Sequence, residues 1–270
     1  MTRRRLLPAA LMIASAFGLT IAIPRAFADH HVPAPGHAVA PTVHVLAIGY
    51  VEPIEGREFI PGKSPDGARR VAGTIVLIEA HDALIVGDPG MVTHQQVITD
   101  ALAEHGYQPG DVTHVFVSHH HPDHTLNVGM FPNAAVVDGV ATYRGDLIED
   151  HPSTHAIAPG VLVTQTPGHT VEDATLLATT PMGMVAFTHL WWDENQQPEV
   201  DPIAEAPDQL TEQRRRILNL ADIIIPGHGR PFVNPDGPRK LDPTTDLSAM
   251  IPTDSDTPAA SHATTQPATD

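Results

Sequence analysis

The chain contains no cysteine among its 270 residues. Disulfide bonds and thiolate metal ligands are therefore both excluded, and so is a cysteine nucleophile. Any metal ion must be held by histidine, aspartate or glutamate. A domain of this composition must gain its stability from its core and from any metal that it binds.

Basic residues are also scarce, because 15 lysines and arginines stand against 32 aspartates and glutamates, for a net charge of -17. Nucleic acid is a poor partner for such a surface, since neutralisation of phosphates by Lys and Arg supplies most of that affinity. We expect a small-molecule substrate and no nucleic acid, and we interpret the acidity as a source of solubility. The sequence predicts no particular oligomeric state.

Residues 1–28 have the pattern of a cleaved secretory signal peptide. A basic segment, "TRRRLL", precedes an apolar run, and the small-residue motif "AFA" ends at Ala28. The alternative is a membrane anchor, but the apolar run from Leu6 to Ile23 contains a proline and is marginal for a span of about 20 residues. We predict export to the periplasm or the extracellular space, with a resemblance to twin-arginine signals, and no stable membrane insertion after cleavage.

The remaining chain is predicted to hold one domain between two irregular ends. Residues 29–41, "DHHVPAPGHAVAP", are typical of a linker. Residues 236–270 are rich in Pro, Thr, Ala, Ser and Asp without apolar periodicity, so we expect a disordered tail. The working domain should span residues 42–235.

Within this domain the apolar patterns predict strands interrupted by helices. Two helices are expected, at residues 93–106 and 208–220. Strands are expected at residues 74–80, 83–88, 112–118, 134–139, 160–166, 174–180, 183–188 and 221–225. Five polar residues come just after such strands, where loops on a rigid scaffold carry catalytic groups disproportionately. They are Asp88, His119, His169, His189 and His228.

The segment "SHHHPDHT" at residues 118–125 is the strongest candidate for a metal site. His119 and His121 are two positions apart, so in an extended segment they face the same side and can reach one metal. Pro122 forces a turn, after which Asp123 and His124 can point at a second position nearby. "TPGHT" and "IPGHG" add His169 and His228 after tight Pro-Gly turns.

These motifs, in this order, resemble the metallo-β-lactamase-fold superfamily. The segments "TIVLIEAHDALIVGDPG" and "RRRILNLADIIIPGHGRPF" look most like the branch of metallo-β-lactamase domain-containing protein 1. The resemblance implies an α/β (α+β) fold, a four-layer αββα sandwich with the metals at one edge of its two sheets. It assigns His119, His121 and His169 to a first metal. It assigns Asp123, His124 and His228 to a second.

Asp88 in "GDPG" would then lie behind the ligands and orient the loop or a ligand imidazole, although it could equally be a turn aspartate. His189 marks a departure, because most hydrolases of this superfamily carry a metal-bridging aspartate at its position. A neutral imidazole offers one lone pair and no charge, so the second metal should bind more weakly. His189 is an added nitrogen ligand, a residue behind the ligands, or a lesion. Asp193 or Glu194 could substitute for the missing carboxylate.

The sequence thus predicts a metal-dependent hydrolase holding one or two zinc ions, with iron as the alternative. A metal-bound hydroxide would attack the carbonyl of an ester, thioester, lactone or lactam, and Asp123 would carry the proton to the leaving group. A mononuclear iron oxygenase acting on a sulfur compound, or a non-catalytic metal-binding relative, are the competing hypotheses. Both rest on the replacement of the bridging aspartate by His189.

Overall fold

The computed structural model describes residues 40–57 and 67–252, which form two large sheets and a small hairpin. The seven-stranded sheet has the order β1-β4-β5-β6-β7-β8-β9. Its strands are β1 (Thr42–Ala47), β4 (Ile75–Ala80), β5 (Ala83–Gly87), β6 (His114–Phe116), β7 (Ala135–Val137), β8 (Ala141–Arg144) and β9 (Leu147–Asp150). The predicted signal peptide and most of the predicted linker lie outside the described residues.

The six-stranded sheet has the order β10-β11-β12-β13-β14-β15. Its strands are β10 (Thr154–Ala158), β11 (Val161–Gln165), β12 (Ala174–Thr180), β13 (Gly183–Thr188), β14 (Ile223–Pro226) and β15 (Phe232–Val233). The helices are α1 (Gln96–Glu104), α2 (Pro122–Thr125) and α3 (Pro207–Leu218), with 3-10 turns η1 (Pro109–Asp111), η2 (Val128–Met130) and η3 (Ser248–Met250).

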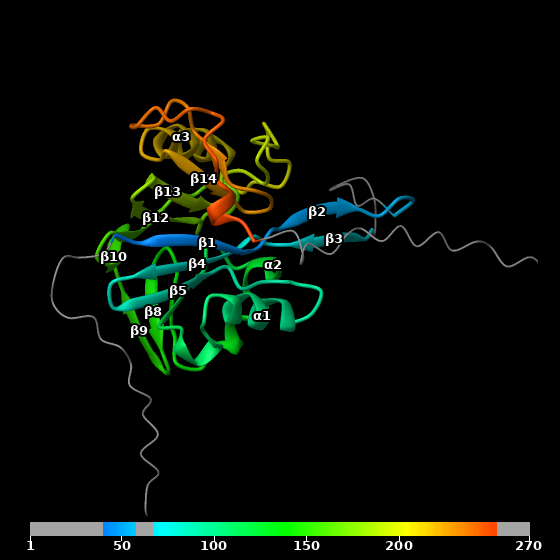
Figure 1. Ribbon diagram of the computed structural model, residues 1–270. Coiled ribbons are helices and arrows are strands. Elements are labelled where there is room, and N and C mark those ends of the chain that lie inside the picture. The colour runs from blue at the N-terminus through cyan, green and yellow to red at the C-terminus, as the bar shows by residue number, and fades with distance from the viewer. Residues whose placement is uncertain (1–39, 58–66, 253–270) are drawn as a thin grey trace, which may run out of the picture. The chain divides into compact units, whose positions relative to one another are not determined.

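The two sheets pack face to face, with α1 on the outer face of one and α3 on the outer face of the other (Figure 1). Between the sheets, Phe116 meets Phe187 edge to face at 6.1 Å between ring centroids. Under α1, Ile98 and Leu102 are buried against the first sheet, and Leu210 and Ile217 of α3 are buried against the second. The predicted αββα sandwich is confirmed.

Burial on both faces explains why β4 reads as a continuous apolar run. Ile75 and Leu77 belong to the cluster under α1, whereas Val76 and Ile78 belong to the cluster between the sheets. Successive side chains of a strand point to opposite faces, so a sheet covered on both sides needs apolar residues at every position.

The prediction of a disordered tail from residue 236 is wrong for residues 236–252. Leu247 and Met250 are buried in the cluster between the sheets, and the backbone N–H of Arg239 donates to Asp222 Oδ1 at 2.7 Å. Two apolar residues spaced among prolines and aspartates make no periodic pattern, yet they suffice to anchor the segment. Residues 253–270 lie outside the described chain.

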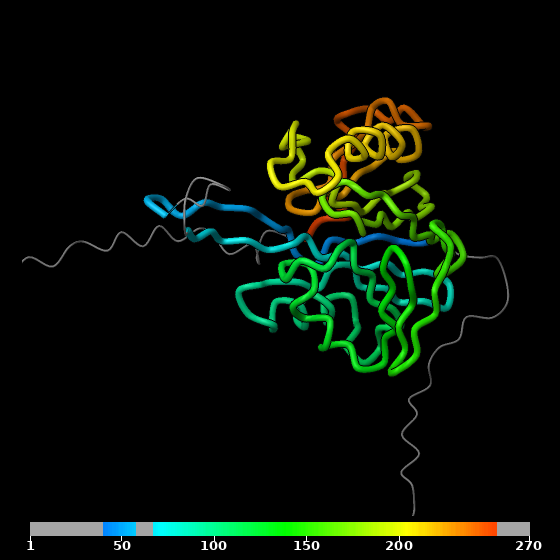
Figure 2. The backbone as a smooth tube through the Cα atoms, turned by 180° about the vertical axis from the view of Figure 1, so that it is seen from behind, coloured from blue at the N-terminus to red at the C-terminus, as the bar shows by residue number. Residues whose placement is uncertain are grey.

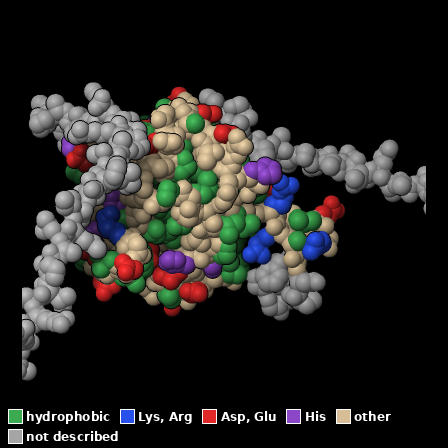
Figure 3. Space-filling model, turned by 90° about the horizontal axis from the view of Figure 1, so that it is seen from below, with side chains coloured by type: hydrophobic (Ala, Val, Ile, Leu, Met, Phe, Trp, Pro, Cys, Tyr) green, Lys and Arg blue, Asp and Glu red, His purple; other side chains and the backbone are tan. Residues whose placement is uncertain are grey.

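The short hairpin of β2 (Tyr50–Pro53) and β3 (Arg69–Ala72) projects from the sandwich, as both backbone views show (Figures 1 and 2). Figure 3 shows basic side chains gathered over this projection, where Arg69 and Arg70 of β3 are exposed. Among the helices of the described residues, none combines the length and apolar character that crossing a membrane requires.

Candidate metal centre

The candidate ligands come from loops that leave both sheets at one edge. β6 leads into the segment that carries His119 and His121, and α2, opened by Pro122, carries Asp123 and His124. The second sheet contributes the other three: His169 after β11, His189 directly after β13, and His228 after β14. The pairs β5–β6 and β13–β14 are parallel, so their carboxyl ends face the same edge.

The first group is formed by His119, His121 and His169, whose ligand atoms lie within 4.8 Å of one another. His121 Nδ1 is 3.0 Å from His119 Nε2 and 3.2 Å from His169 Nε2. Nitrogens bound to one tetrahedral zinc at about 2.0–2.1 Å lie about 3.3 Å apart. The three nitrogens therefore already have the spacing of ligands around one metal ion.

The second group is formed by Asp123, His124 and His228. Asp123 Oδ2 lies 3.4 Å from His124 Nε2 and 3.5 Å from His228 Nε2. The six residues predicted from the motif thus come together as two neighbouring triads, one of nitrogens alone and one that includes a carboxylate.

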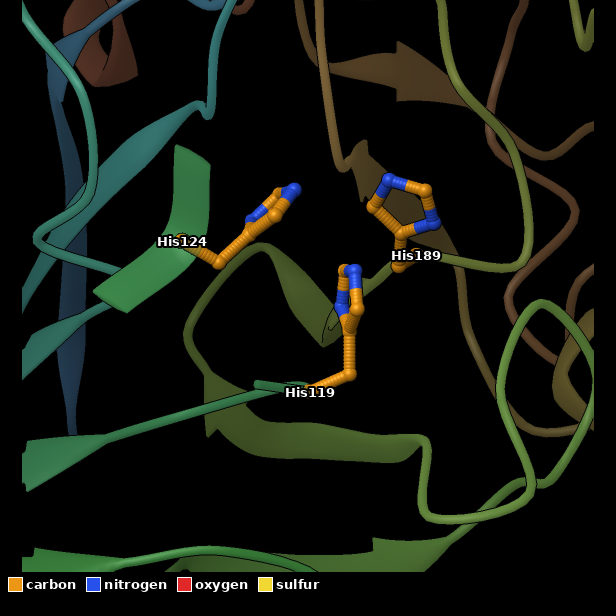
Figure 4. Close-up of side chains that lie close together, drawn as sticks. All are labelled: His119, His124 and His189. Atoms are coloured by element: carbon orange, nitrogen blue, oxygen red, sulfur yellow. The ribbon is translucent and has the colours of Figure 1, made fainter. Parts of the chain in front are cut away.

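His189 lies among these side chains rather than behind them. It forms a third group with His119 and His124 (Figure 4), and its Nε2 is 3.1 Å from His228 Nε2. Its ring centroid is 4.3 Å from that of His169. The suggestion that Asp193 or Glu194 substitutes for the missing carboxylate is wrong, because neither belongs to a metal-ligating group of the described residues.

Asp193 and Glu194 are instead used within their own loop. Asp193 Oδ1 accepts the backbone N–H groups of Asn195 and Gln197, and Glu194 Oε2 accepts that of Arg230. The centre consequently has one carboxylate, from Asp123, and six imidazoles.

Hydrogen bonds on the outer side of the rings fix which nitrogen faces inward. Asp88 Oδ2 lies 2.8 Å from His124 Nδ1, Asp201 Oδ2 lies 2.7 Å from His169 Nδ1, and the carbonyl of Ala72 lies 2.7 Å from His228 Nδ1. Because these partners can only accept, each Nδ1 carries a proton and each Nε2 faces the centre, where it offers a lone pair whenever the ring is neutral.

Asp88 does more than orient one imidazole. Its carboxylate also accepts the backbone N–H of Ser118 at 2.7 Å and the Ser118 hydroxyl at 2.6 Å. It thus holds both the first residue of the histidine loop and the ring of His124. The backbone of Asp88 has a positive φ of 48°, which bends the chain sharply after β5.

Two buried aspartates that lie behind the candidate ligands were missed by sequence reasoning. Asp201 accepts from the Trp192 indole N–H at 3.2 Å as well as from His169. Asp173 lies 4.0 Å from His119 Nδ1, and burial raises the pKa of Asp173 to about 6. Nothing in the local sequence marks either residue, because the fold alone places them behind the histidines.

Burial is the largest single influence on the pKa of the buried imidazoles in the centre. Burial and the neighbouring imidazoles hold the pKa of His119 and of His189 well below the ordinary value, and they lower the pKa of His228 to about 3. Burial also acts to lower the pKa of His124, but the carboxylates of Asp88 and Asp123 outweigh it and raise that pKa to about 9. Without a metal ion, the His124 ring therefore holds a second proton at neutral pH, which a metal at its Nε2 must displace.

Three glycines let backbone approach the ligands closely. A Cβ on Gly90 would lie 1.7 Å from the backbone oxygen of Asp123. A Cβ on Gly73 would lie 2.9 Å from His124 Nδ1, and one on Gly227 would lie 2.1 Å from His189 Cδ2. The second triad and His189 are therefore packed against main chain with no room for a side chain.

A cavity of about 230 Å³ opens onto the centre. It is lined by five of the candidate ligands, His121, Asp123, His169, His189 and His228, and by Val51, Arg69, Val71, Pro122, Trp192 and Ile203. Trp191, in contrast, is buried in the cluster under α3. His120, between two candidate ligands, faces away and lies 3.0 Å from Asp138 Oδ2.

Comparison with known proteins places these features in context. A family model described as the metallo-beta-lactamase superfamily matches residues 68–229. Metallo-beta-lactamase domain-containing protein 1 of Xenopus laevis is 30% identical over 210 residues, covering 75% of this chain and 84% of that protein. The protein of the same name from Rattus norvegicus is 34% identical over 204 residues, covering 70% and 75%.

Among solved structures, an N-acyl homoserine lactone hydrolase with N-hexanoyl-L-homoserine bound at its catalytic metal center is similar in fold. It superposes with a TM-score of 0.52 at 18% identity, over 72% of this chain and 94% of that one. This likeness concerns the arrangement of the sheets and helices.

Proposed function

The chain belongs to the metallo-beta-lactamase superfamily, and on that premise we propose that it is a metal-dependent hydrolase with zinc at the histidine centre. One observation carries the proposal: Asp88, Asp201 and the carbonyl of Ala72 hold three buried imidazoles through Nδ1, so that each Nε2 faces the other candidate ligands of its own triad. The relatives named metallo-beta-lactamase domain-containing protein 1 and the hydrolase of similar fold support it.

The residues fit metal ions on their own chemistry. His124 Nε2 and His189 Nδ1 are buried and have no hydrogen-bond partner among the described residues. Burying a polar nitrogen without a partner is costly, and a metal would satisfy such an atom. Neutral histidine and aspartate are ligands that zinc prefers. We assign His119, His121 and His169 to a first zinc, and Asp123, His124 and His228 to a second.

When bound, zinc supplies an acidified water and a Lewis acid for a substrate oxygen. The protein's part is to hold the substrate carbonyl at the mouth of the cavity and to manage the proton. Asp123 suits the second task, because its carboxylate lies at the cavity wall and its side chain is 18% exposed. Burial acts to raise the pKa of Asp123, but the close contact with His124 outweighs it and lowers that pKa, so Asp123 is ionised, as a zinc ligand must be.

The cavity favours substrates with an apolar part beside the scissile bond. Val51, Val71 and Ile203 line it together with Trp192, and burial of apolar surface would favour a matching group. The lining also includes Arg69, at the exposed edge of the hairpin. We propose an ester, thioester, lactone or lactam of this kind, met outside the cytoplasm if the N-terminal signal is used as predicted.

The test is metal analysis of the purified protein followed by a screen of esters, thioesters, lactones and β-lactams. We expect about two zinc ions at the histidine centre of each chain and turnover that chelators abolish. His119→Ala should lose most of the first metal and the turnover, whereas His120→Ala, on the neighbouring ring that faces Asp138, should keep both. Full activity of His119→Ala would overturn the assignment.

His189 favours a second candidate function. A sixth imidazole in place of a carboxylate makes the centre rich in nitrogen, and such a set also suits iron. The candidate is a mononuclear iron oxygenase that acts on a sulfur compound. One iron per chain and oxygen consumption with thiol substrates would support it, whereas two zinc ions at the histidine centre would exclude it. Metal binding with no turnover in either screen would indicate a non-catalytic relative.

A further inference from the structure

We propose a further metal site in this protein, which is formed by His44, Glu79 and His105 and is separate from both triads of the histidine centre. The site would hold one divalent transition-metal ion, with zinc as the natural candidate. The residues come from three different elements, and 61 positions separate the first from the last in the sequence, 44 to 105. The proposal does not depend on hydrolysis at the other centre.

The strand pairing places the first two residues on one face of the sheet. His44 of β1 is opposite Leu77 of β4, and Glu79 follows Leu77 two positions later. Alternate residues of a strand share a face, and Leu77 and Leu46 both pack in the cluster under α1. His44 and Glu79 therefore point toward the helix layer, away from the core between the sheets.

His105 completes the group from the end of α1, as the residue that follows Glu104. Its backbone N–H donates within the last turn, to Leu102 O at 3.1 Å. The carboxyl end of a helix carries a partial negative charge, which favours a cation there. The helix thus contributes both a ligand and a favourable field.

The three side chains converge. Their ligand atoms lie within 4.8 Å of one another, and His44 Nε2 is 3.5 Å from Glu79 Oε1. The two imidazole rings are 4.4 Å apart between centroids. Separations of 3.4 and 3.5 Å occur between the imidazoles and the carboxylate of the second triad of the histidine centre, so the contact between His44 and Glu79 has the same length.

Tyr107 supports the carboxylate from behind. Its hydroxyl donates to Glu79 Oε2 at 2.9 Å, which leaves Oε1 directed at the imidazoles. A hydrogen bond to the second oxygen of a ligand carboxylate is the usual arrangement around bound metals.

Open space beside the group leaves room for water to complete the coordination. A cavity of about 210 Å³ is lined by His44, His105 and Glu104, together with the end of the described chain at Pro252. Two histidines and one glutamate are a common ligand set for zinc with an open position. Such an ion would tie the edge strand β1 to β4 and to α1 in a chain that has no disulfide.

The test is zinc stoichiometry of the whole protein after equilibration with buffered zinc, by elemental analysis. We expect His105→Asn and Glu79→Gln to hold one zinc fewer per chain than the parent. The control is His81→Asn, since His81 contacts Asp82 in an exposed turn outside the group and should leave the count unchanged. Zinc should also raise the melting temperature of the parent more than that of either variant.

Glu79→Gln keeps the shape of the side chain and an oxygen that can accept from Tyr107, so it tests the charge without removing the packing. Circular dichroism shows whether a variant is folded. Where the parent has turnover, retained turnover shows that the histidine centre of the variant still holds its zinc. Equal zinc content in the parent, His105→Asn and Glu79→Gln would overturn the proposal. The count compares variants with the parent and is independent of any activity at the other centre.

Discussion

Gly90→Ala should displace the ligands of the second triad, although Gly90 itself has no side chain that could bind the metal. The added Cβ would lie 1.7 Å from the backbone oxygen of Asp123, and real Cβ contacts are not closer than 3.0 Å, so the two segments must separate by about 1.3 Å. That oxygen also accepts the backbone N–H groups of Gly73 and Met91, at 3.1 and 3.2 Å. Metal ligands tolerate errors of only about 0.2 Å.

The expected result is loss of the second metal and a fall in stability of about 3 kcal/mol, because overpacking a rigid site costs roughly 1–3 kcal/mol and main chain cannot rotate away. For a domain of this size, that corresponds to a melting temperature lower by about 6–12 °C. Gly129→Ala is the matched control, since a Cβ there meets nothing within 4 Å among the described residues. Full metal content and a melting temperature within about 2 °C of the parent would refute the reasoning.

Three further predictions concern the charges around the centre. His189→Asp should raise the affinity for the second metal on the order of tenfold, since a carboxylate offsets the repulsion between two cations. Chelator competition that compares this variant with His189→Asn measures the effect. Equal affinities would place His189 outside the ligands. His124 is protonated below about pH 9 and must be neutral to bind metal, so the affinity for the second metal should rise as the pH rises toward 9. Metal binding should then release a proton from His124, and Asp88→Asn should release about one proton fewer. Calorimetry in buffers of different ionisation enthalpy measures this number. Asp201→Asn should weaken the first metal about 10- to 100-fold by removing the charge behind His169, measured by zinc-indicator titration; an unchanged affinity would make Asp201 a packing residue only.

The sequence predicts the fold best where strands are buried on both faces. Residues 174–180 and 183–188 match β12 and β13 at both ends, because each run has the length of a strand and Pro181 and Met182 mark the turn between them. β9 was missed since all four of its residues are exposed, so its sequence "LIED" carries no burial pattern. The segment 236–252 was misjudged for the related reason that two buried side chains, Leu247 and Met250, make no periodicity.

The same limit applies to the candidate site. Ligands that share one short loop, such as His119 and His121, reveal themselves through spacing that local geometry requires. Asp201 does not, because its contact with His169 spans 32 positions and exists only once the loop after β13 folds back. The group of His44 and His105 is likewise invisible in sequence, since it needs the register of two strands and the end of a helix.

The ligands of the histidine centre are divided between the two sheets. His119, His121, Asp123 and His124 follow strands of the first sheet, and the remaining three follow strands of the second. Neither half of the chain can assemble a triad of imidazoles with full affinity by itself, since His169 must join His119 and His121. High-affinity metal binding can therefore begin only after the two sheets have docked. The rate at which the refolding protein takes up metal reports the rate of that docking step.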